Sequence, residues 1–161
     1  MQRKLAFVVL LAIASTPFLH STGAAAQPAP DPGKIITLAD VQSVTAGKFE
    51  GRVVEPGVVF YEETGGARVI EISLSIAGPG KTVSEVKSSR LQDGEPVEDV
   101  AGIGEAAIYR PQANSVTVEK KNKAGELQWL EVRVQNVEGA DRDAVTKRMA
   151  IELARRGAAR L

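Results

Sequence analysis

The chain has 161 residues and a balanced charge, with 20 Lys and Arg against 20 Asp and Glu. This balance gives no electrostatic reason to expect nucleic-acid binding. The chain contains no cysteine, which excludes disulfides and every site built on a thiolate.

The first 26 residues have the pattern of a secretory signal peptide. Arg3 and Lys4 precede an apolar run from Leu5 to about Leu19, and an Ala-x-Ala cleavage site lies just before Gln27. The run is shorter than the roughly 20 residues that a membrane-spanning helix needs. We therefore expect a periplasmic or secreted protein that has no transmembrane anchor in its mature form.

Cleavage at this site would also remove His20, the only histidine. The remaining 135 residues would contain neither imidazole nor thiol, which excludes Ser-His-Asp and Cys-His catalysis and zinc or copper sites built on those groups. They would hold 18 basic and 20 acidic residues, since the removed segment carries two basic residues and no acid. A chain of this size suits one domain. Residues 27–34 are predicted to form a proline-rich leader, and residues 35–161 a single α+β domain.

Hydrophobic periodicity predicts three helices and five to six strands. The most regular strand runs from Arg68 to Ile76, where apolar and polar residues alternate, and a capping box of Thr82 and Glu85 opens the second helix. This order of elements predicts an α+β domain with an antiparallel sheet packed by the helices. The predicted helices span 38–46, 82–92 and 141–156, and the predicted strands span 58–62, 68–76, 97–100, 105–110, 115–120 and 127–135.

In the last predicted strand, Leu127 and Trp129 alternate with Leu130, Val132 and Val134. Apolar residues on both sides of a strand indicate that both faces of the sheet are covered. We therefore expect Trp129 to lie in the core.

The segment from Val100 to Arg110 contains Gly102 and Gly104 in Gly-x-Gly spacing. A dinucleotide-binding loop needs a third glycine and a position between a strand and a helix, so that backbone amides and the helix N-terminus meet the phosphates. The third glycine is absent here, and the residues that follow have the pattern of a strand. The segment therefore predicts a tight turn that requires positive φ at glycine, and no cofactor is expected.

This glycine-containing segment, residues 100–107, is followed by Val116-Thr117-Val118 and a closing helix that ends in Ala-Arg-Leu. The combination resembles bacterial cell-envelope domains of unknown function, typified by small lipoproteins and some kinase sensor domains, which carry a Val-x-Gly-Leu-Gly-Asp-x-Ala signature. Val59-Phe60-Tyr61 lies where those domains have a Cys-x-Tyr strand, with valine in place of the cysteine. The resemblance implies an extracytoplasmic α+β domain that has no catalytic residues.

Two other groups have the composition of a catalytic or metal site. Ser84 and Lys87 match Ser-x-x-Lys, but the further motifs of penicillin-recognising enzymes are absent. An acidic cluster does not follow the spacing of a calcium-binding loop, which favours a solvated edge over a metal site. The cluster leaves open an alternative function, a small carboxylate-dependent hydrolase acting on envelope glycans. It consists of Asp93, Glu95, Glu98, Asp99 and Glu105.

Basic residues gather at a predicted hairpin tip and along the last predicted helix, where they could contact phosphate, an anionic glycan or an anionic membrane surface. We predict a non-catalytic binding or interaction module, without metal or cofactor, whose partner is an envelope protein, polymer or lipid. The candidate interaction surface consists of Lys120, Lys121, Lys123, Arg148, Arg155 and Arg156.

We expect the exported protein to begin at or near Gln27 and to be recovered without detergent. N-terminal sequencing of protein from the periplasm or the culture medium measures the cleavage site directly. Full-length protein that only detergent extracts would contradict this prediction, because residues 1–26 would then be retained as an anchor.

Overall fold

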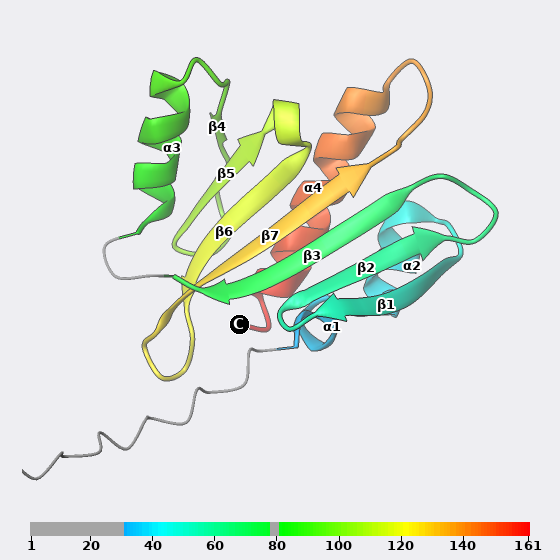
Figure 1. Cartoon of the computed structure of the whole chain (residues 1–161), viewed down its shortest axis with the longest axis horizontal. Helices are drawn as coiled ribbons and strands as arrows, with labels where there is room; N and C mark the ends of the chain where they lie inside the picture. The colour runs from blue at the N-terminus through cyan, green and yellow to red at the C-terminus, as the bar shows by residue number, and fades with distance from the viewer. Residues whose placement is uncertain (1–30, 78–80) are drawn as a thin grey trace, which may run out of the picture.

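Seven strands form one antiparallel sheet in the computed structural model, which describes residues 31–77 and 81–161. The sheet order is β1-β2-β3-β7-β6-β5-β4, and the described chain is α+β as its sequence predicts (Figure 1). The predicted signal peptide lies outside the described residues. The strands are β1 (Phe49–Glu55), β2 (Val58–Glu63), β3 (Val69–Ile76), β4 (Glu98–Asp99), β5 (Ala106–Arg110), β6 (Ser115–Lys121) and β7 (Leu127–Gln135). The α-helices are α1 (Pro32–Ile35), α2 (Leu38–Thr45), α3 (Val83–Gln92) and α4 (Arg142–Ala158), and Pro111–Ala113 forms a 3₁₀ turn.

The described residues contain more elements than the sequence predicts, with seven strands instead of five to six and four α-helices instead of three. The sequence pattern does not reveal β1, because Phe49 is its only buried residue and no alternation results. Helix α1 occupies part of residues 27–34, the segment predicted to form a proline-rich leader. Asp31 caps it by accepting a hydrogen bond from the Gly33 N–H, and Pro32 starts its first turn. No helix within residues 31–77 and 81–161 has the length and apolarity needed to cross a bilayer.

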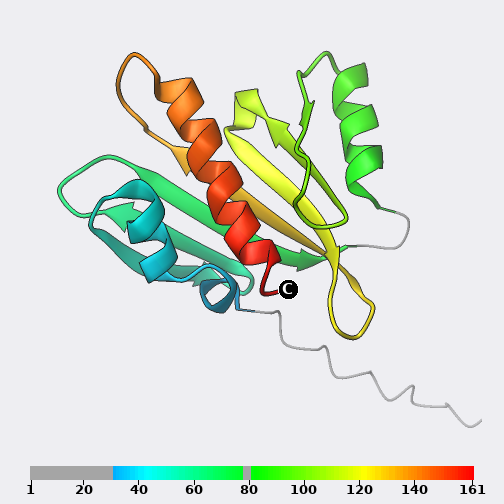
Figure 2. The ribbon, with the colours of Figure 1, turned by 180° about the vertical axis from the view of Figure 1, so that it is seen from behind.

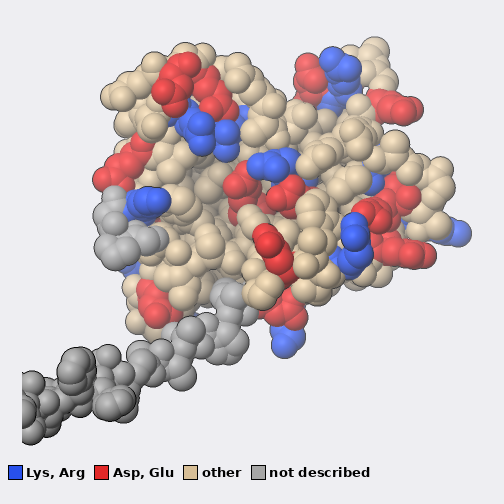
Figure 3. Space-filling model, in the orientation of Figure 1, with Lys and Arg blue, Asp and Glu red and all other residues tan. Residues whose placement is uncertain are grey.

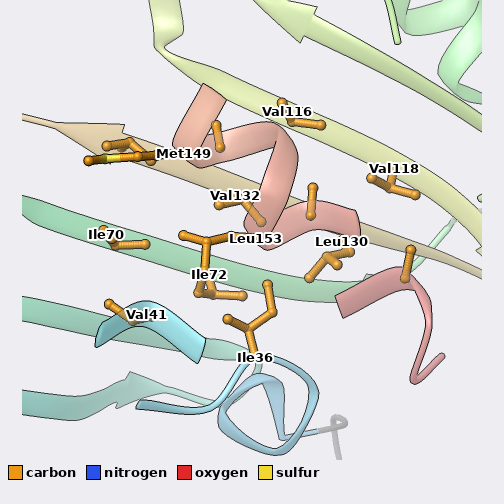
Figure 4. Packing of buried hydrophobic residues seen from close by; sticks show 14 of the residues in the cluster. Ile36, Val41, Ile70, Ile72, Val116, Val118, Leu130, Val132, Met149 and Leu153 are labelled. Atoms are coloured by element: carbon orange, nitrogen blue, oxygen red, sulfur yellow. The ribbon is translucent and has the colours of Figure 1, made fainter. Parts of the chain in front are cut away.

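Helices α2 and α4 lie on the same face of the sheet (Figure 2). Along β7 every second residue is buried, so that Leu130, Val132 and Val134 point toward α4. Leu153 and Met149 of α4 meet these side chains from the other side (Figure 4). Each fully buried Leu or Val contributes about 1.5–3 kcal/mol relative to an exposed one, so this layer is the main source of stability.

The face of the sheet opposite α4 is only partly covered. Helix α3 packs against β5 and β6, and the Val83 N–H donates to the Glu119 carboxylate at 2.7 Å. Trp129 lies on this face, is half-buried, and donates its Nε1–H to the same carboxylate at 3.4 Å. The prediction that Trp129 belongs to the core is therefore wrong, because α3 covers only one side of this face. Figure 3 shows the face, with acidic and basic side chains exposed among uncharged ones.

Near its C-terminus α4 approaches the sheet so closely that one position excludes a side chain. A Cβ added at Gly157 would lie 2.5 Å from Cδ2 of Leu130 and 2.9 Å from Cγ1 of Ile36. Real Cβ atoms do not approach other heavy atoms this closely, so glycine is required here for steric reasons. The contact joins the last helix, the central strand β7 and the segment before α2.

A charged cluster fixes the end of α4 to the beginning of α2. Asp40 belongs to the capping box of α2 and accepts a hydrogen bond from the Thr37 N–H at 2.9 Å. Arg160 donates to both carboxylate oxygens of Asp40, at 2.6 and 3.0 Å, and Arg156 lies 3.6 Å away. The Arg160 guanidinium holds the pKa of Asp40 well below its usual range, although burial acts in the opposite direction.

We expect Asp40→Asn to lower the free energy of unfolding at neutral pH by about 2 kcal/mol, because it removes the negative charge that Arg160 faces. The pKa of Asp40 is lower in the folded chain than in the unfolded chain. Its contribution is therefore complete above the unfolded pKa, about 4, and is lost as the pH falls through the folded pKa. Denaturant titrations at about pH 7 and about pH 2 measure the difference between variant and wild type, which should shrink at the lower pH.

The exposed Asp93, which has no ion-pair partner among the described residues, provides the control. Asp93→Asn should change stability by less than about 0.5 kcal/mol. A difference between Asp40→Asn and wild type that stays the same at both pH values would show that the charge of Asp40 does not stabilise the fold.

Candidate functional site

The glycine-containing segment is a tight turn between β4 and β5, as its sequence predicts. Gly102 and Gly104 have φ of 75° and 61°, values that favour glycine. Strand β5 follows the turn directly, so no helix N-terminus is available for phosphate. The Glu105 N–H donates to the Glu119 carbonyl at 2.8 Å, which ties the turn to β6.

This turn forms one wall of a hollow of about 370 Å³ at the C-terminal end of α4. Lys120 and Lys121 from β6 and Arg155 from α4 line the same hollow. The turn therefore places two predicted groups of basic residues, from the hairpin strand and the last helix, around one space.

A second hollow of about 360 Å³ lies along the outer side of α4. Ala144 and Ile151 contribute apolar surface to it, and Lys147 and Arg148 line it beside them. Arg155 lines both hollows, which therefore lie next to each other along α4. We call the basic residues that line the two hollows the α4 strip; they are Lys120, Lys121, Lys147, Arg148 and Arg155.

The α4 strip contains four of the six residues predicted to form an interaction surface. Arg156 is turned toward α2 instead, where its guanidinium lies 3.6 Å from Asp40. Lys123 is exposed at the β6–β7 turn and lines neither hollow. Lys147 is one of the basic residues of the last predicted helix but is not among the six residues of the predicted surface, although it is four residues before Ile151 and therefore on the same side of the helix.

Three charges of the α4 strip, those of Lys121, Arg148 and Arg155, are only weakly engaged by the described residues. Lys121 Nζ lies 4.0 Å from the Glu105 carboxylate, and Arg155 pairs with Glu152 at 2.9 Å, in both cases between exposed side chains. Arg148 has no ion-pair partner within residues 31–77 and 81–161. Exposed pairs contribute about 0–1 kcal/mol each, so an anionic ligand can compete with them.

Lys120 has a different environment, because its ammonium donates to the Ala158 carbonyl at the end of α4. A cation at this place satisfies a free carbonyl and interacts favourably with the helix dipole. Lys120 therefore stabilises the end of α4 as well as lining the hollow.

The acidic cluster is divided among separate ion pairs. Glu95 pairs with Arg110 at 2.9 Å, and Asp99 pairs with Lys87 at 2.6 Å. Glu98 pairs with Lys147 and Glu105 faces Lys121. Asp93 is exposed at the C-cap of α3. The part of the chain that the structure describes contains no group of three His, Cys, Asp or Glu residues placed to hold a metal ion.

The same ion pairs involve the lysine of the Ser-x-x-Lys motif, because the Lys87 ammonium donates to the Asp99 carboxylate. A base for Ser84 would need a free amine instead. The hydrolase alternative has no support from this cluster. Apart from Asp93, each of its carboxylates lies beside a cation in a separate ion pair.

No protein-family model, curated protein or solved structure matches the chain. The resemblance to bacterial cell-envelope domains stays a prediction, and the geometry of the site is the basis for a functional proposal.

We expect Gly104→Ala to destabilise the fold by about 2–3 kcal/mol for two reasons. An added Cβ would lie 2.5 Å from the Glu119 carbonyl oxygen, and the positive φ is unfavourable for alanine. Gly102→Ala is the matched control. Its φ is also positive, but a Cβ there meets nothing within 4 Å, so we expect a loss of about 1 kcal/mol. Denaturant unfolding measures both values. Equal losses would show that the approach of Glu119 does not limit this position.

Proposed function

We propose that the protein is an exported, non-catalytic binding domain that holds an anionic component of the cell envelope on the α4 strip. The observation that carries the proposal is the gathering of basic side chains around two neighbouring hollows that share Arg155. Five basic side chains and two acidic ones line them, whereas the chain as a whole has no net positive charge. A local excess of one charge on a balanced chain favours a ligand of the opposite charge.

The shape of the α4 strip indicates what such a ligand presents. Lys147 and Arg155 are eight residues apart on one side of the helix, a distance of about 12 Å along its axis. Ala144 and Ile151 contribute apolar surface beside the charges. A ligand that carries several negative groups over this length, beside an apolar part, would match both features.

The residue types of the predicted mature chain and the ion pairs of the acidic cluster support the non-catalytic part of the proposal. Without histidine and cysteine, catalysis would require free carboxylates or a free lysine. Apart from Asp93, the carboxylates of the acidic cluster lie beside cations, and Lys87 is paired with Asp99. These contacts support a structural role for the cluster.

We expect the processed chain to bind dextran sulfate, or vesicles that contain phosphatidylglycerol, in a way that weakens with salt. Arg148→Gln combined with Arg155→Gln should lower the affinity about ten- to thirtyfold, at about 1 kcal/mol for each charge lost. Fluorescence titration and vesicle co-sedimentation measure the two cases and separate a polymer ligand from a lipid surface.

Lys34→Gln combined with Lys48→Gln is the matched control, because both lysines are exposed and lie outside the α4 strip. This pair should reduce binding by less than about threefold. An equal loss in the two double variants, or no binding by the wild type, would count against the proposal. Turnover of an envelope glycan that disappears in Glu98→Gln would favour the hydrolase instead.

A further inference from the structure

Strand β1 is an open edge of the sheet. Among the described residues its only strand neighbour is β2, whereas β4, at the opposite edge, is two residues long (Figure 1). Residues 50–55 are all exposed, and Val53 and Val54 retain 67% and 49% of their accessible surface. An exposed edge strand of this kind is a template for pairing with another strand.

Two hydrogen bonds show which backbone groups of β1 face outward. The Lys48 carbonyl accepts from the Thr64 N–H at 2.8 Å, toward β2. The next carbonyl, that of Phe49, accepts from Gln42 Nε2 instead, at 3.4 Å. Because the direction alternates along an antiparallel strand, the backbone groups of Gly51 also point away from β2.

The outward-facing stretch is limited at both ends. Gln42 occupies the Phe49 carbonyl, and a bulge interrupts the register between Val53 and Glu55. Gly51 therefore lies at the centre of the free edge. It has no side chain, and a Cβ added there would lie 3.0 Å from the Tyr61 ring on the helix-covered face. A second backbone can approach such a position closely.

The charges beside Gly51 are incompletely paired. Glu50 lies directly opposite Glu62 across β1 and β2, and like charges in this arrangement are destabilising. Arg52 binds Glu62 at 2.7 Å, with both side chains more than half exposed. Within the described part of the chain, Glu50 itself has no cationic partner.

We propose that a second copy of this chain adds to the sheet through β1, in antiparallel register with Gly51 opposite Gly51 of the partner copy. The two outward-facing glycines would then exchange their backbone hydrogen bonds. In this register Glu50 lies directly opposite Arg52 of the partner copy, and the two-fold symmetry creates the pair twice. Each new pair supplies the cation that Glu50 lacks beside Glu62.

The charge pattern selects both the occupant and the register. Centring the pairing on Arg52 would place two arginines opposite each other, which opposes association. The segment Glu50-Gly51-Arg52 is complementary to itself when it runs antiparallel, so a second copy fits without any other partner. The proposal is independent of the α4 strip, which lies on a different part of the molecule.

Sedimentation equilibrium of the processed chain, from about 1 to about 500 μM, tests the proposal. We expect a concentration-dependent dimer. Glu50→Arg alone and Arg52→Glu alone each place like charges opposite each other, and each should raise the dissociation constant at least about tenfold. The double variant with both changes restores opposite charges and should return the constant to within about threefold of the wild type.

Val53→Pro provides a second, independent variant. The Val53 N–H faces the free edge by the same alternation, so proline removes no bond to β2 but places its ring on the edge where the partner strand would lie. Thermal melting of each monomer shows whether the fold is kept. A chain that stays monomeric at every concentration would overturn the proposal, even if it captured an extended peptide. A dimer that Val53→Pro and the single reversals leave unchanged, or a double variant that does not recover, would also overturn it.

Discussion

The close approach of α4 to the middle of the sheet is the constraint on which the rest of the structure depends. The chain has no cysteine, so noncovalent contacts must hold the last helix against the sheet. Gly157 permits the approach, because any side chain there would overlap Leu130 and Ile36. The pair between Arg160 and Asp40 then fixes the chain just beyond α4 to the start of α2. One steric fit and one ion pair thus join the two ends of the described fold.

The same packing determines what α4 presents to solvent. Its inner side is occupied by small and apolar residues, including Ala150 and Ala154, which have no exposed surface. With 3.6 residues per turn, a four-residue spacing keeps Lys147, Ile151 and Arg155 together on another side of the helix. The basic surface therefore arises from residues that the core cannot use. This surface lies beside the turn at residues 102–104 because α4 ends over that part of the sheet.

The elements that could be predicted from the sequence are those in which buried and exposed residues repeat at a regular spacing. Strands β3 and β7 alternate along most of their length, and the capping box of Thr82 and Glu85 marks the start of α3. Strand β1 has no such period, since it lies at an edge and buries one residue. The site was predicted only in part for a similar reason. Arg155 and Arg156 are neighbours in sequence, but successive helical residues are rotated by about 100° about the axis. Arg155 therefore lies in the α4 strip, whereas Arg156 lies beside α2.

Pairing through β1 would have a consequence for binding that neither surface has alone. In a continuous antiparallel sheet the two-fold axis runs perpendicular to the sheet, so both copies of α4 would lie on the same face. The two basic strips would then face the same direction, away from the shared sheet. A ligand with repeated negative groups, such as a polymer or a membrane surface, could contact both strips at once. The second contact would be intramolecular, which raises overall affinity without any new residue in the site. A small monovalent anion would gain nothing, so dimer formation would favour extended anionic partners over free ions.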